Sequence, residues 1–162
     1  ATLRDKLIEL ASCGVDQCVI LKFDARLSSL SPEAFIEDVL VKDLKRTQLV
    51  MYSGTSGDYN PLHTDDVYCR EAAGYPGVFA HGMLTMGMTG RIVTDRFGAE
   101  NVKKYGVRFT NQVWPGDDLM AKAVVDAVRQ EGGDTLVDLT ITTTNQKGDA
   151  VLSGYATARA GT

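Results

Sequence analysis

The sequence predicts an α+β fold, in which an antiparallel sheet wraps around one long, buried helix. Two observations support this: an apolar, glycine-containing segment at residues 80–97, and a series of alternating segments after residue 105 joined by short links. With 162 residues, the chain is long enough for one domain with a substantial core.

The segment 80–97 has the spacing of a helix. Leu84, Met88 and Ile92 recur every four residues, and further apolar side chains fill the remaining surface. A helix that is apolar nearly all round is a buried one. Each glycine inside a helix costs about 1 kcal/mol relative to alanine, so several together predict a close approach of the backbone to another group. These glycines are Gly82, Gly87 and Gly90.

The last third of the chain is rich in alternating and β-branched residues. Short links that contain glycine separate its segments, which predicts an antiparallel meander of consecutive strands. A sheet of this kind wrapped around a central helix is the hotdog fold. The predicted strands are 105–113, 119–128, 136–143 and 151–158.

The region before the central helix predicts shorter elements. Residues 3–11 form an amphipathic helix that ends at Gly14, and residues 18–23 form a strand. Residues 31–33 begin a helix, with the alternative that 35–41 is extended. Two more helices are predicted at 47–53 and 64–73, followed by a turn at 74–77.

The domain organisation predicted from this pattern is simple. Residues 1–30 are an N-terminal extension to which the sequence assigns no role, and residues 31–162 are a single domain. Internal repeats and an interdomain linker are not evident.

Composition excludes several classes of function. A net charge of −4 argues against nucleic acid, which usually requires a basic face. No run approaches the roughly 20 apolar residues that cross a bilayer, and charges near the amino end argue against a secretory signal. Three cysteines without CxxC spacing fit a reducing compartment. The predicted location is the cytoplasm, with a processed organellar protein as the alternative.

The run from Gly57 to His63 contains a carboxylate, an amide, a proline and one of only two histidines. Pro61 prevents a continuous helix, so the segment must be a stiffened loop. Such a loop can make Asp58 and His63 converge on one water and exchange protons with it. Asn60 can orient the water or the ligand.

Two alternatives to this interpretation are a structural loop and a metal site. In the first, Asp58 caps the following turn and His63 bonds backbone. The second can be assembled only on paper, because the spacing contains no His-x-x-x-His pair and does not match a calcium loop. We therefore predict no metal. The residues considered for it are Asp58, His63, Asp65, Asp66 and His81.

A second unusual run starts at His81 and Gly82. Gly82 lies at the predicted amino end of the buried helix, where free N–H groups and the helix dipole favour negative charge. Its N–H can therefore stabilise a carbonyl oxygen that gains charge during a reaction. His81 itself is predicted to be structural. Together the two runs favour addition of water to, or its removal from, a double bond conjugated to a carbonyl.

These segments resemble the signatures of the MaoC-like family of R-specific enoyl-CoA hydratases and dehydratases. The resemblance covers about residues 38–160. One departure is Cys69, where the family often has alanine or serine. The matching runs are 57–63, 81–84, 107–110 and 115–119.

The resemblance implies a catalytic pair, Asp58 and His63, with Asn60 as the orienting asparagine and the Gly82 N–H as oxyanion donor. It also implies a hotdog fold, a dimer and an acyl thioester substrate, carried by coenzyme A or acyl carrier protein. No metal or redox cofactor is expected. The expected enzyme is a hydro-lyase that reversibly converts trans-2-enoyl thioesters to (R)-3-hydroxyacyl thioesters. The sequence leaves open which of Asp58 and His63 is the acid and which the base, and we favour His63 as the base toward water.

The alternatives are a hotdog acyl-CoA thioesterase and a non-catalytic subunit that binds acyl thioesters. A homodimer, or an oligomer of dimers, is expected because pairing removes an exposed sheet edge. Candidate contacts for coenzyme A phosphates are Arg70, Arg91, Lys103, Lys104 and Arg108.

Overall fold

The computed structural model describes residues 35–160. The predicted N-terminal extension, and the elements predicted at 3–11, 18–23 and 31–33, lie outside the described residues. Among those that are described, no helix is long and apolar enough to cross a membrane.

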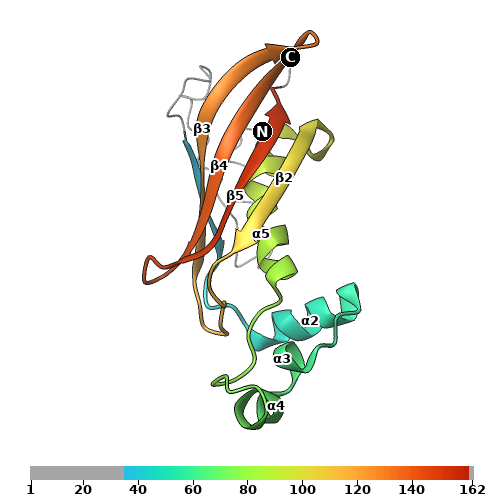
Figure 1. Cartoon of the computed structure of the whole chain (residues 1–162), viewed down its shortest axis with the longest axis vertical. Coiled ribbons are helices and arrows are strands. Elements are labelled where there is room, and N and C mark those ends of the chain that lie inside the picture. The colour runs from blue at the N-terminus through green and yellow to red at the C-terminus, as the bar shows by residue number, and fades with distance from the viewer. Residues whose placement is uncertain (1–34, 161–162) are drawn as a thin grey trace, which may run out of the picture.

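A five-stranded antiparallel sheet and a 16-residue helix dominate the fold (Figure 1). The helix, α5, contacts β1, β2, β3 and β5, which confirms the predicted hotdog architecture. Three short helices gather beyond the end of the sheet near the start of α5 (Figure 1). In chain order the elements are β1 (Phe35–Val41), α2 (Arg46–Ser56), α3 (Pro61–Thr64), α4 (Asp66–Glu71), α5 (Gly82–Phe97), the 3-10 helix η2 (Ala99–Asn101), β2 (Val102–Phe109), β3 (Leu119–Glu131), β4 (Asp134–Asn145) and β5 (Ala150–Arg159).

The strand order is β1-β3-β4-β5-β2, so the predicted meander is correct only for β3, β4 and β5. The strand predicted at 105–113 ends at Phe109 and pairs with β5 at the opposite edge, not with β3. The place beside β3 is taken by β1, the extended alternative for residues 35–41. Residues 110–118 therefore connect β2, at one edge of the sheet, to β3, which lies next to the other edge. Two backbone hydrogen bonds hold this connection: Leu44 donates to the carbonyl of Asp117 and accepts the N–H of Gly116.

The helix predicted at 64–73 is α4 at Asp66–Glu71, and a separate short helix, α3, occupies Pro61–Thr64 at the end of the run predicted to be a loop. Asp65 is in extended backbone between them, and its Oδ1 accepts the N–H groups of Val67 and Tyr68 at the start of α4. A side chain that bonds its own backbone in this way competes with helix continuation. The helix predicted at 47–53 is confirmed as α2.

The core has two parts. One lies between α5 and strands β3 to β5, and the other packs the short helices against the end of the sheet near the start of α5. The buried face of α5 differs from the prediction: Leu84 and Met88 are only half-buried, and Met83 is 57% exposed. Helix α5 is thus buried on one side rather than all round. Its buried side chains are Thr85, Thr89, Ile92, Val93 and Phe97.

Two of the three α5 glycines make the predicted close approach. A Cβ at Gly82 would lie 3.0 Å from the ring of Phe109, and one at Gly90 would lie 3.2 Å from the ring of Tyr105. A Cβ at Gly87 would meet nothing within 4 Å. Strand β2 therefore packs directly on the helix backbone at two points.

Candidate active site

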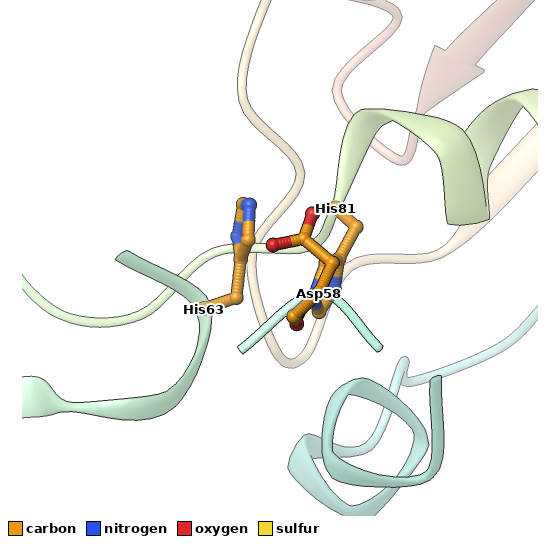
Figure 2. A group of neighbouring side chains, drawn as sticks. All are labelled: Asp58, His63 and His81. Atoms are coloured by element: carbon orange, nitrogen blue, oxygen red, sulfur yellow. The ribbon is translucent and has the colours of Figure 1, made fainter. Parts of the chain in front are cut away.

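Three side chains converge where the loop after α2 meets the start of α5. Ligand atoms of Asp58, His63 and His81 all lie within 4.8 Å of one another. Figure 2 shows the carboxylate of Asp58 directed towards the ring of His63, with His81 beside them. The convergence expected for the first two residues is thus present, and His81 joins them.

His63 comes from α3, which starts at Pro61. Its Nδ1 lies 2.7 Å from the carbonyl oxygen of Phe79. A carbonyl can only accept, so Nδ1 carries the proton and Nε2 of the neutral ring has a free lone pair. Burial lowers the pKa of His63 below its ordinary 6.5, against the opposing effect of the Phe79 carbonyl. Burial therefore favours the neutral form of this ring, in which Nε2 can accept a proton.

Asp58 is exposed and is held through its local backbone. Its Oδ1 accepts the N–H of Asn60 at 3.2 Å, and its own N–H donates to the hydroxyl of Ser56 at 3.2 Å. Its Oδ2 has no hydrogen-bond partner within residues 35–160. The bonds of the structural alternative are thus present at both Asp58 and His63, and each leaves one atom available for chemistry.

Asn60 has a structural role with one of its two polar atoms. Its Oδ1 accepts the N–H of Leu62 at 3.0 Å and so caps α3. Its Nδ2 has no partner in the described part of the chain. The predicted orientation of water or ligand would use this Nδ2.

His81 is 1% exposed, and its Nε2 lies 3.0 Å from the carbonyl oxygen of Asp58 and 3.3 Å from Oγ of Ser53. The rings of His81 and His63 stack with their centroids 3.9 Å apart. His81 thereby links helix α2, the Asp58 loop and α5.

Gly82 is the first residue of α5, directly after His81. Its N–H precedes the helical hydrogen bonds and has no partner among the described residues. The cleft beside it has a volume of about 270 Å³ and a mixed lining. Its walls include Phe79, Gly82, Thr85, Phe109, Asn111 and Gln112.

The larger metal site considered from sequence does not assemble. Asp65 caps α4, and Asp66 pairs with Arg46 and accepts the N–H of Val78. Only Asp58, His63 and His81 remain together, as donor types that a transition metal also accepts.

Sequence reasoning missed three groups at the site. Ser53 is buried in α2 and Phe79 acts through its main-chain oxygen, so neither gives a side-chain signal. Phe109 reaches Gly82 only because β2 crosses to the far edge of the sheet. Of the candidate phosphate contacts, Arg70 and Arg91 pair with Asp66 and Asp95.

Residues 31–147 match the family described as "MaoC like domain". This match covers well over half of the chain, and the chain belongs to that family. Residues 1–56 also match the description "FAD synthetase". The described part of that range forms β1 and α2 of the same sheet-and-helix unit.

Relatives with curated names point in the same direction. A 3-hydroxyacyl-thioester dehydratase Y of Mycobacterium tuberculosis is 40% identical over 67 residues, 40% of this chain and 23% of the relative. The enoyl-CoA hydratase ChsH3 of the same organism is 32% identical over 105 residues, 63% of this chain and 36% of the relative. The chain thus covers 23% and 36% of the lengths of these two relatives.

Among solved structures, the R-hydratase PhaJ1 of Pseudomonas aeruginosa in its unliganded form has a TM-score of 0.71. It is 24% identical, and the match covers 82% of this chain and 83% of that one. At this identity the likeness shows the fold.

Proposed function

We propose that the protein is a hydro-lyase that reversibly adds water to trans-2-enoyl thioesters, giving (R)-3-hydroxyacyl thioesters. The observation that carries this proposal is the convergence of the Asp58 carboxylate with the His63 ring, whose Nδ1 is bonded to Phe79, and with His81, the residue before the first N–H of α5. The printed names of the relatives, a thioester dehydratase and an enoyl-CoA hydratase, support the same chemistry.

His63 and Asp58 act together on one water in this proposal. The lone pair of His63 Nε2 accepts a proton from the water as its oxygen attacks Cβ of the enoyl group. The carboxylate of Asp58 accepts a hydrogen bond from the second O–H of the water, and its negative charge stabilises the imidazolium that forms on His63. The same proton then passes from the pair to Cα, so that one water supplies both the hydroxyl and the hydrogen.

The N–H of Gly82 stabilises the negative charge that develops on the thioester oxygen between these steps. It points from the positive end of α5, and the adjoining cleft can receive the acyl group. Asn60 orients the water through Nδ2. The proposed reaction requires no metal or redox cofactor.

The test is hydration of crotonyl-CoA, followed by loss of enoyl absorbance. Asp58→Asn and His63→Gln should each lower kcat by at least about 10²-fold while circular dichroism and Tm stay close to those of the wild type. Tyr59→Phe, an exposed neighbour in the same loop, is the matched control. Undiminished turnover in both site variants would reject the proposal.

Two further measurements separate the alternatives. Release of free thiol from an acyl-CoA would indicate a thioesterase. Tight binding of acyl-CoA without turnover would indicate a non-catalytic subunit.

We also infer a homodimer. Strands β1 and β2 are the two sheet edges, and β2 ends in the half-exposed Phe109 beside the cleft. Pairing of an edge across a two-fold axis would satisfy its free backbone groups. Sedimentation at micromolar concentration should give twice the mass of the chain, and a monomer would overturn this inference.

A further inference from the structure

His81 holds its proton on Nε2. The hydroxyl of Ser53 donates to the carbonyl of Leu49 at 3.1 Å, so towards His81 it can only accept. The carbonyl of Asp58 can also only accept. Two acceptors around one nitrogen require a donor, so Nε2 carries hydrogen.

The other nitrogen of His81 fixes the charge of the ring. Nδ1 is buried without a hydrogen-bond partner in the described part of the chain. A charged ring would bury an unpaired N–H and place a cation against the stacked ring of His63, whereas a neutral ring leaves only a lone pair. His81 is therefore neutral, with the opposite tautomer to His63.

We propose that His81 is a positioning residue for the reaction proposed above: its Nε2–H clamps the main-chain carbonyl of Asp58, and its face supports the ring of His63. It touches neither water nor thioester. Tyr52 on α2 packs against the ring with centroids 4.9 Å apart and prevents it from turning away. The distance between the carboxylate of Asp58 and the imidazole of His63 thus depends on the side chain of His81, which comes from a different loop.

The inference rests on the proposed function, but its first test does not. The chain has only two histidines, so nitrogen NMR of the labelled protein near pH 7.5 reports these two rings alone. We expect one Nε2–H ring, assigned to His81, and one Nδ1–H ring, assigned to His63. A protonated Nδ1 on His81 would overturn the proposal, whether or not the protein hydrates enoyl thioesters.

The second test uses two amides of different reach. In His81→Gln the amide nitrogen reaches about as far as Nε2 and can still donate to the carbonyl of Asp58. In His81→Asn it reaches only as far as Nδ1 and cannot.

We expect the glutamine variant to keep at least a third of kcat for crotonyl-CoA, and the asparagine variant to lose about 10²-fold, with KM little changed. The affinity and stoichiometry of butyryl-CoA, measured by calorimetry, should match in both variants. A merely structural role would instead lower Tm and the binding stoichiometry in both, and equal kcat values in the two would overturn the clamp. If the wild type hydrates nothing, the proposed function fails, and the NMR result still decides the clamp.

Discussion

The imidazole rings of His63 and His81 stack with centroids 3.9 Å apart and planes 33° apart. Each ring directs its protonated nitrogen at a main-chain carbonyl, that of Phe79 for His63 and that of Asp58 for His81. The two carbonyls lie on different loops, so the stack fixes one loop against the other. The bond to Phe79 leaves Nε2 of His63 with a lone pair, in a group where the Asp58 carboxylate and both imidazoles have atoms within 4.8 Å of one another.

The pH dependence of activity should follow His63. Burial lowers the pKa of this ring below 6.5, and the proposed base must be neutral. The decline of kcat/KM for crotonyl-CoA at acid pH should therefore be centred below pH 6.5. A decline centred above pH 6.5 would contradict this assignment.

The same ring should contribute to the pH dependence of stability. As the pH falls through the ordinary value of about 6.5, the unfolded chain takes up a proton at position 63 that the folded protein does not. The free energy of unfolding should then decrease until the pH reaches the lowered pKa of the folded state. Urea unfolding from pH 8 to 5 should show a smaller decrease in His63→Gln.

The N–H of Gly82 can be removed almost in isolation. Proline is favoured at the first position of a helix and lacks this hydrogen, and His81 already has the extended backbone that must precede a proline (φ −57°, ψ 133°). Gly82→Ala is the matched control, because it adds a Cβ against Phe109 and keeps the N–H. We expect kcat of Gly82→Pro to be about 10²-fold below that of Gly82→Ala. Equal values would show that the N–H is not the oxyanion donor.

Thr89 on α5 and Thr143 on β4 are both fully buried, and their hydroxyls lie 2.8 Å apart. Valine at either position should lower the free energy of unfolding by about 1–3 kcal/mol, because one hydroxyl loses its partner. The double variant should be nearly as stable as the wild type. Additive losses in a double-mutant cycle, measured by urea unfolding, would refute this coupling.

Two glycines of α5 should respond in opposite ways to alanine. Gly87→Ala meets nothing within 4 Å and should raise the free energy of unfolding by up to about 1 kcal/mol. Gly90→Ala should lower it, because the Tyr105 ring beside it is anchored by a 2.7 Å hydrogen bond to the carbonyl of Met86. Equal shifts in Tm would contradict the packing of β2 on this helix.

A chelator should leave turnover unchanged. Asp58, His63 and His81 have the donor types of a metal site, but the proposed reaction draws its proton transfer and charge stabilisation from protein groups alone. Dialysis against EDTA, followed by the crotonyl-CoA assay, checks this. Loss of activity that zinc restores would contradict it.

Sequence periodicity predicted the fold class and the helix–loop setting of the site, because local spacing encodes both. It failed for the partner of β2, because two neighbouring strands give the same alternating pattern whether they pair or cross to opposite edges. Strand β1 excludes β2 from the edge of β3, because β1 itself pairs there, for example through Phe35 opposite Val124.

The site was predicted to a similar degree. Asp58, His63 and Gly82 stand out as residue types in unusual runs; the fold places the first two together with His81, the residue that precedes Gly82. The hydrogen bond that leaves Nε2 of His63 available comes from the carbonyl of Phe79, and the hydroxyl of Ser53 contacts His81; both groups are distant along the chain from the rings that they bond. Every residue has a main-chain carbonyl oxygen, so the amino-acid sequence does not show which carbonyl will bond His63.

The dependence of both histidines on carbonyls has a consequence for how the protein can vary. The side chain at position 79 can change in size or polarity without altering which nitrogen of His63 is protonated, provided that the peptide plane keeps its direction. Substitutions that change the backbone conformation should therefore be tolerated least at this site. Positions that form turns or start helices should accept fewer residue types than many positions whose side chains face the cleft.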